Sequence, residues 1–203
     1  MIFRFPYLIF YITFAKPLKH DLMEHVRLNG KVFKTFIEYG TIMKAIDDVA
    51  DRINADYKGC TDVPVLLCVL NGSIMFTAEL MKRLDFDLEL VSIKLTSYSG
   101  TESTGKVRQA MGLTADIKGR RVIIVEDIVD TGNTIEELKK ILGERGAAES
   151  KVCTMLLKPE VYDKSSRLDY VAMEIPNRFI VGFGLDYDEI GRNLKDIYVL
   201  DED

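Results

Sequence analysis

The sequence predicts an α/β protein with an open, mostly parallel sheet that is flanked by helices. Short, uninterrupted apolar runs such as residues 64–70 and 122–125 are typical of strands that are buried on both faces. Segments with apolar side chains at helical spacing alternate with these runs, and that alternation is typical of parallel sheets. The 203 residues contain no repeat and no linker rich in Pro, Gly or Ser, so we expect one domain.

Two helices are predicted in the first half of the chain. Residues 41–57 place apolar side chains at helical spacing, with Thr41 at the N-cap position. Residues 74–84 follow a turn that ends at Ser73, whose hydroxyl is expected to cap this helix.

The rest of the chain is predicted to contain a polar loop, one helix and several strands. Residues 96–109 are almost all Thr, Ser, Gly or charged, which predicts a mobile functional loop. Residues 135–145 carry apolar side chains on one helical face. Further strands are predicted at residues 86–95, 121–125, 152–157, 170–174 and 179–182.

Composition and charge exclude several classes of function. The net charge of −5 gives no broad attraction to nucleic acid. The three cysteines are far apart in the sequence, which favours free thiols in a reducing, cytoplasmic compartment. The two histidines, His20 and His25, lie near the N-terminus and leave a zinc site without ligands at plausible spacing, so any metal should be a hard cation bound by oxygen.

Residues 1–22 are an apolar N-terminal extension. The run MIFRFPYLIFYITFA is interrupted by Arg4 and Pro6, is short for a membrane span of about 20 residues, and is not followed by a small-residue cleavage pattern. We expect an over-long start, with Met23 as the initiator and no membrane partner. An ordered apolar arm and an export or anchoring segment are the alternatives.

The most informative segment is residues 122–134, where a buried strand runs into acids, a Gly-containing turn and a helix. Free backbone N–H groups and the helix dipole at such a turn bind phosphate. The acids Glu126, Asp127 and Asp130 would repel phosphate unless a cation or a sugar hydroxyl lies between. The segment therefore predicts a phosphorylated sugar with Mg²⁺. In an open parallel sheet ligands bind at the carboxyl ends of strands, so residues 70–72, 126–134 and Lys158 should converge there.

Residues 125–134, Val-Glu-Asp-Ile-Val-Asp-Thr-Gly-Asn-Thr, resemble the phosphoribosyl pyrophosphate (PRPP) signature of type I phosphoribosyltransferases. The resemblance implies that family's fold, with a small hood subdomain formed by the terminal segments of a single domain, residues 23–203. It also implies that Glu126 and Asp127 face the ribose hydroxyls and a Mg²⁺ shell. The 5′-phosphate would be held by four neighbouring residues, Thr131, Gly132, Asn133 and Thr134.

Two further segments resemble loops of this family. Leu70-Asn71-Gly72-Ser73 resembles the pyrophosphate loop, which implies a cis peptide between Leu70 and Asn71. Asn71 departs from relatives that carry a basic residue there, which removes the charge of that side chain. Ser97 and Tyr98, followed by residues 103–105, resemble the flexible loop of the hypoxanthine-guanine branch, which closes over the site and excludes water.

The purine would be recognised by residues near the C-terminus. The resemblance implies that Lys158 donates to the oxygen at purine C6, which favours 6-oxopurines because an ammonium has no acceptor. The segment beginning at residue 178 resembles the family's purine and second-metal segment. It implies four roles, namely stacking by Phe179, base hydrogen bonds by the Ile180 backbone, Mg²⁺ ligation by Asp186 and pyrophosphate contact by Arg192.

The resemblance thus implies a Mg²⁺-dependent enzyme that converts PRPP and hypoxanthine or guanine into IMP or GMP plus pyrophosphate. Asp130 stands where a general base could take the proton from purine N7. The family resemblance implies a homodimer or homotetramer. The alternatives are a xanthine-preferring 6-oxopurine transferase and an RNA-binding regulator on the same fold, against which the acidic balance argues.

Overall fold

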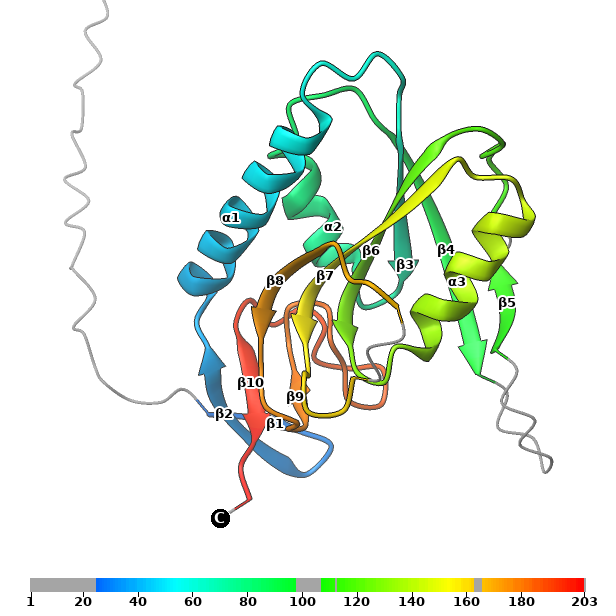
Figure 1. Ribbon diagram of the computed structural model, residues 1–203. Coiled ribbons are helices and arrows are strands. Elements are labelled where there is room, and N and C mark those ends of the chain that lie inside the picture. The colour runs from blue at the N-terminus through cyan, green and yellow to red at the C-terminus, as the bar shows by residue number, and fades with distance from the viewer. Residues whose placement is uncertain (1–24, 98–106, 112, 163–165, 203) are drawn as a thin grey trace, which may run out of the picture.

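The computed structural model describes residues 25–97, 107–111, 113–162 and 166–202. They form two sheets, a six-stranded sheet of order β5-β4-β3-β6-β7-β8 and a four-stranded sheet of order β1-β2-β10-β9 (Figure 1). The large sheet is parallel except for the antiparallel pair of β4 and β5, which confirms the predicted fold class. Its strands are β3 (Val65–Leu70), β4 (Glu89–Ser97), β5 (Val107–Met111), β6 (Arg121–Val129), β7 (Glu149–Leu157) and β8 (Tyr170–Glu174).

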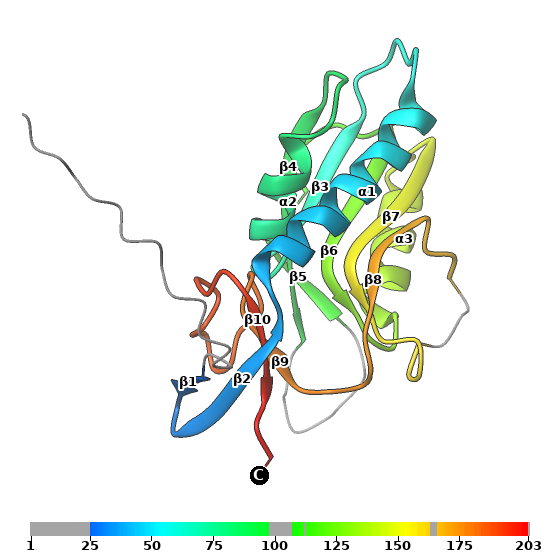
Figure 2. The ribbon, with the colours of Figure 1, turned by 90° about the vertical axis from the view of Figure 1, so that its left-hand side faces the viewer.

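Helices cover both faces of the large sheet. Helices α1 (Tyr39–Tyr57) and α2 (Ile74–Met81) lie on one face, and α3 (Asn133–Glu144) lies on the other (Figure 2). Alternate residues of β3 divide accordingly, since Leu66 packs in the core with α1 and α2, and Leu67 in the core with α3. This burial on both faces explains the uninterrupted apolar runs in the sequence.

The small sheet joins both ends of the described chain. It contains β1 (His25–Leu28), β2 (Lys31–Ile37), β9 (Ile180–Val181) and β10 (Ile197–Leu200), and all its pairs are antiparallel. It lies beside the carboxyl ends of the large sheet (Figure 1). This small sheet corresponds to the small hood subdomain of the predicted fold class. Of the helices in the described part of the chain, none has both the length and the apolar character needed to cross a membrane.

Several predicted boundaries were wrong. Helix α1 begins at Tyr39, before Thr41, and its N-cap Glu38 makes no side-chain cap. Helix α2 ends at Met81 rather than at residue 84, and Ser73 does not cap it, because the buried hydroxyl donates to the carbonyl of Val69 at 2.6 Å.

The predicted loop and strands also need correction. Residues 107–109, expected in the polar loop, belong to the edge strand β5. An edge strand needs no continuous apolar run, so its polar sequence concealed it. Strand β4 begins at Glu89 and not at residue 86, and helix α3 begins at Asn133 and not at residue 135. The N-terminal extension, residues 1–22, and residues 98–106 of the predicted polar loop lie outside the described residues.

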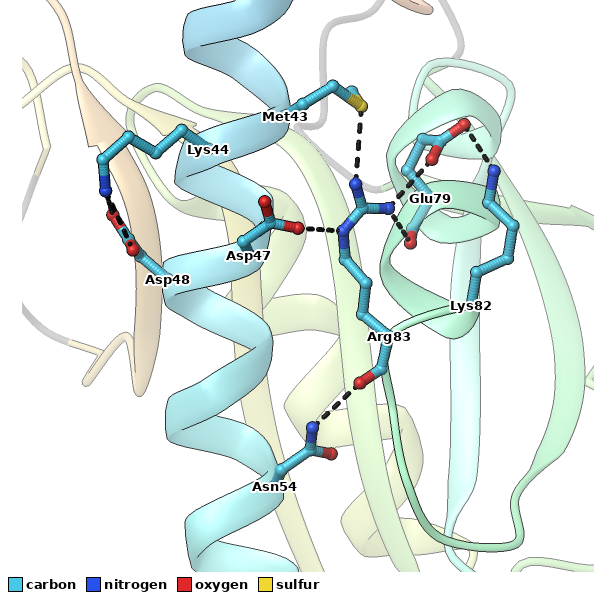
Figure 3. Close-up of polar contacts among 8 residues, drawn as sticks. All are labelled: Met43, Lys44, Asp47, Asp48, Asn54, Glu79, Lys82 and Arg83. Carbon is cyan, nitrogen blue, oxygen red and sulfur yellow. Dashed lines mark hydrogen bonds and ion pairs between the residues drawn. The ribbon is translucent and has the colours of Figure 1, made fainter.

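An arginine joins the two helices on one face of the sheet. The Arg83 guanidinium, just after α2, donates to the Glu79 carbonyl at 2.8 Å and to the Glu79 carboxylate at 2.9 Å (Figure 3). It also donates to Asp47 on α1, and its Nη2 lies 3.7 Å from the sulfur of Met43. These carboxylates raise the pKa of Arg83, so the guanidinium stays charged where it connects the helices.

Replacing Arg83 with Ala is expected to lower the free energy of unfolding by about 1–3 kcal/mol, because the carboxylates lose a charged donor. Urea unfolding measures the change. Lys44→Ala is the matched control, since Lys44 forms only an exposed pair with Asp48 on the same helix (Figure 3). Equal unfolding midpoints for the two variants would show that Arg83 does not hold the helices together.

Candidate functional site

The carboxyl ends of β3, β6 and β7 bring together residues that are far apart in the sequence. The turn after β3 approaches Asp127 of β6 closely, because a Cβ added to Gly72 would lie 1.5 Å from Asp127 Oδ2. The backbone N–H of Lys158, just after β7, donates to the Val129 carbonyl at 3.0 Å. The predicted convergence at this end of the sheet is therefore present. The peptide between Leu70 and Asn71 is cis, as the resemblance implied.

A phosphate-sized hollow lies between β6 and α3. Residues 126 and 128–135 line a cavity of about 90 Å³. Gly132 is the N-cap of α3 and has a φ of +89°, a conformation that favours glycine. A Cβ there would lie 2.7 Å from the ring of Tyr162, so both the backbone conformation and the lack of space disfavour a side chain at this position. The first N–H groups of the 12-residue helix α3 open onto this hollow without intrahelical partners.

Two acids lie at the end of β6, Glu126, which is buried without a partner in the part of the chain that the structure describes, and Asp127, which is partly buried. Glu126 is 8% exposed, and its Oε2 atom has no hydrogen-bond partner among the described residues. Burial, and then the negative charge of Asp127, raise the pKa of Glu126 well above its usual value. Burial also raises the pKa of Asp127 to about 6, although the Ile128 N–H donates to this carboxylate at 2.8 Å and Arg192 adds positive charge.

These carboxylates fit a hard divalent cation. Glu126 Oε2 is buried without a partner in the described part of the chain and lies near the carboxylate of Asp127. Together the two side chains offer the oxygen ligands that such a cation prefers, and the cation would neutralise their negative charge. Within the described ranges, no group of three or more His, Cys, Asp or Glu side chains could enclose a metal. Mg²⁺ usually takes one or two protein carboxylates and completes its shell with water and substrate phosphates, so a pair of acids is sufficient.

Asp127→Asn is expected to stabilise the ligand-free protein. The carboxyl has its raised pKa only when folded, so its ionisation destabilises the folded state as pH rises from about 4 to about 6. In EDTA at pH 8 the variant should gain up to about 3 kcal/mol in unfolding free energy, and this gain should vanish near pH 4. Urea unfolding at both pH values measures this gain, with Asp48→Asn, at an exposed position of α1, as the control. A pH-independent difference would contradict the assigned burial cost.

The segment after β9 closes the site from the other side. A Cβ on Gly184, which has a φ of +100°, would lie 2.0 Å from the Gly72 carbonyl oxygen. Arg192 donates to the Gly184 carbonyl at 2.9 Å and pairs with Asp186 at 2.6 Å. The charges of Arg192 and Asp186 both act on the pKa of Asp127, so the predicted metal and pyrophosphate residues are neighbours.

Lys158 and Asp130 form a pair at the strand ends. Lys158 is 9% exposed, and its ammonium lies 3.4 Å from Asp130 Oδ2. Asp130 is half exposed and directly precedes the phosphate hollow. The buried ammonium of Lys158 and the accessible carboxylate of Asp130 are therefore neighbours in space, although the residues are 28 positions apart in the sequence.

An exposed aromatic ring lies on the small sheet. Phe179 is 44% exposed, and the centre of its ring lies 5.5 Å from that of Tyr187, in a T-shaped arrangement, and 6.0 Å from that of Phe33. The Lys31 ammonium lies 4.9 Å from the centre of the Tyr187 ring and 6.0 Å from that of Phe179. Large exposed aromatic surface is available for stacking on a planar ligand.

The backbone of Ile180 is free for a ligand on one side. Leu200 N–H donates to the Phe179 carbonyl at 3.0 Å, so Phe179 and Leu200 form a hydrogen-bonded pair of the antiparallel ladder. The next pair, Ile180 and Val199, must then turn its N–H and C=O groups away from each other. Since β9 ends the sheet order, the backbone polar groups of Ile180 point outward from the sheet edge.

Some predicted residues could not be placed, and others were missed. Tyr98 lies outside the described residues, and only the backbone of Ser97 is described, at the end of β4. The sequence reasoning missed Lys31 and Tyr187, which support Phe179, and Gly184, which packs on the pyrophosphate loop. The Gly-x-Gly pattern at residues 182–184 was the available signal for a close backbone approach.

Comparison with known proteins agrees with this geometry. The family model described as phosphoribosyl transferase domain matches residues 37–188. A hypoxanthine-guanine phosphoribosyltransferase of Streptococcus pneumoniae is 41% identical over 177 residues, which cover 87% of this chain and 97% of the relative. The protein of that name from Lactococcus lactis is 39% identical over 174 residues, covering 85% and 93%.

Solved structures show the same similarity. A crystal structure of a hypoxanthine-guanine phosphoribosyltransferase from Bacillus anthracis superposes with a TM-score of 0.76 at 36% identity, covering 81% of this chain and 96% of that chain. A hypoxanthine phosphoribosyltransferase of Trypanosoma cruzi gives 0.78 at 37% identity, covering 87% and 95%. Because the family model spans most of the chain and relatives near 40% identity align almost end to end, the chain belongs to the phosphoribosyltransferase family.

Proposed function

We propose that the protein transfers the phosphoribosyl group of PRPP to hypoxanthine or guanine, forming IMP or GMP and pyrophosphate with Mg²⁺. The observation that carries this proposal is the Lys158–Asp130 pair beside the phosphate hollow, with the ammonium 3.4 Å from the carboxylate. It puts a donor for the base and an acceptor for its proton next to a sugar-phosphate site. The names of the relatives from Streptococcus pneumoniae and Lactococcus lactis support the same activity.

The 5′-phosphate is assigned to residues 131–134 at the start of α3. The N–H groups at the N-terminus of this helix donate to the anion, and the hydroxyls of Thr131 and Thr134 add donors. The ribose hydroxyls then face buried Glu126 and partly buried Asp127, whose carboxylates accept hydrogen bonds. This binding fixes ribose C1 in front of the purine site.

The leaving pyrophosphate is assigned to residues 70–72 and Arg192. Gly72 packs against Asp127, and Arg192 brings a charged donor close to that carboxylate. When bound, Mg²⁺ neutralises negative charge on the leaving group. Glu126 and Asp127 would face the shell of one Mg²⁺, and Asp186 would hold a second Mg²⁺.

The base is assigned to Lys158, Phe179 and Ile180. An ammonium has donors but no acceptor, so Lys158 selects the C6 oxygen of a 6-oxopurine over the C6 amino group of adenine. Phe179 stacks on the ring, and the outward N–H and C=O groups of Ile180 bind the edge of the base.

The reaction forms a bond between purine N9 and ribose C1 and breaks the bond from C1 to the pyrophosphate oxygen. The purine loses a proton from N7, and Asp130 accepts it as the general base. Positive charge on the sugar is shielded from water by the site, to which Ser97 and Tyr98 are assigned as part of a closing loop.

The direct test is incubation with PRPP, Mg²⁺ and each of hypoxanthine, guanine, xanthine and adenine, with the nucleotides separated and measured. Formation of IMP or GMP is the expected result. Product from xanthine alone would indicate a xanthine-preferring transferase. Product from adenine alone would contradict the role of Lys158 in recognising the C6 oxygen. RNA binding without any nucleotide formation would instead select a regulator.

The proposed partners are small molecules, and the proposed assembly is a homodimer or homotetramer in the cytoplasm, without nucleic acid or membrane. The net charge of −5 and the free thiols Cys60, Cys68 and Cys153 support this setting. Light scattering behind size-exclusion chromatography measures the assembly, and a monomer would contradict it.

A further inference from the structure

A lysine of β4 stands beside the pyrophosphate loop. Leu70, the last residue of β3, is in register with Lys94 of the neighbouring parallel strand. Neighbouring strands lie about 4.8 Å apart, which is less than the reach of an extended lysine side chain. Lys94 can therefore reach the turn at residues 71–73, which follows Leu70 directly.

The side chain of Lys94 lies on the same face of the sheet as α2. On that face Cys68 and Leu70 of β3, Leu90 and Ser92 of β4, and residues of α2 line a cavity of about 310 Å³. Lys94 lies two residues after Ser92, and two residues restore the side-chain direction in a strand. Ile93 packs instead in the core with α3, as this alternation requires. Lys94 thus faces the beginning of α2, where the pyrophosphate loop ends.

Lys94 is not neutralised by the described residues. Lys158 pairs with Asp130, and Arg192 pairs with Asp186, but no hydrogen bond or ion pair joins Lys94 to any residue in the described part of the chain. The start of the eight-residue helix α2 adds further positive potential on the same side. A free cation beside a helix N-terminus is unfavourable until an anion arrives.

The loop itself lacks the charge that pyrophosphate requires. Asn71 is neutral, and Arg192, which reaches the loop through Gly184, is already paired with Asp186 at 2.6 Å. We propose that Lys94 supplies the missing cationic contact to the pyrophosphate of PRPP, reaching it from the strand next to the loop. This inference rests on the proposed function, since it extends the pyrophosphate site assigned there. Lys94 acts on binding of the phosphates and has no contact with the base.

The first experiment compares wild type with Lys94→Met, which keeps the length of the stem and removes the charge. The KM for PRPP should rise about tenfold, as loss of a charge-assisted contact predicts, with kcat and the KM for hypoxanthine nearly unchanged. The affinity for magnesium pyrophosphate, measured by calorimetry, should fall by a similar factor. Lys94→Arg should retain both, and Lys118→Met, exposed at the amino end of β6, should change neither.

A second variant tests the charge itself rather than packing. Adding Asn71→Lys to Lys94→Met returns a cation to the same loop, and the KM for PRPP should return to within about threefold of wild type. Unchanged pyrophosphate affinity in Lys94→Met would overturn the proposal, and so would failure of Lys94→Arg to retain it. If wild type forms no nucleotide, the proposed function fails, while the calorimetric comparison still decides the role of Lys94.

Discussion

Replacing Asp130 with Asn is expected to lower kcat about 10²- to 10⁴-fold, the range by which positioned general bases accelerate reactions. The amide keeps the size of the carboxylate but cannot accept the purine proton. The KM for PRPP should stay within about threefold of wild type, because the N–H groups at the start of α3 and the carboxylates of β6 are untouched. Steady-state kinetics with hypoxanthine separates the two constants.

The surroundings of Asp130 make this substitution informative. Its carboxylate is half exposed and lies 3.4 Å from the ammonium of Lys158. Loss of such a partly exposed pair costs little stability, so the variant should fold. Asp48→Asn, an exposed acid on α1, is the control for a change of charge. Turnover in Asp130→Asn equal to that of wild type would remove the general-base role.

The sequence predicts best the part of the site whose residues are consecutive in the chain. Residues 126–134 carry the acids, the glycine and the threonines in one strand, turn and helix, so local chemistry suffices to interpret them. The position of Lys158 followed from the rule that parallel strands end at one edge of a sheet. The structure bears this out through the contact of Lys158 with Asp130.

The small sheet could not be predicted in the same way. Strand β2 pairs with β10 near the other end of the chain, so neither strand is defined by local periodicity. The contact of Lys31 with Tyr187 depends on this distant pairing. The failed cap at Ser73 has a similar cause, because its hydroxyl reaches back to the strand once the turn is buried.

The second large effect is expected for Gly72→Ala. An added Cβ would lie 1.5 Å from Asp127 Oδ2 and 2.5 Å from Asp127 Cγ, so the methyl group and the carboxylate cannot both keep their places. Asp127 has little freedom to retreat, because it is partly buried and accepts a hydrogen bond from the Ile128 N–H at 2.8 Å. The loop cannot retreat easily either, since Gly184 packs against the Gly72 carbonyl.

We therefore expect Gly72→Ala to reduce kcat/KM for PRPP by about 100-fold or more, as a misplacement near 1 Å in a catalytic site does. Gly143→Ala is the matched control, because nothing lies within 4 Å of an added Cβ at this position in α3. That variant should keep full activity and gain about 0.5–1 kcal/mol in unfolding stability. Magnesium pyrophosphate calorimetry on both variants shows whether the lost activity is lost binding. A Gly72→Ala protein with wild-type affinity and kcat/KM would mean that Asp127 and the loop move freely, and the assigned metal position would then be wrong.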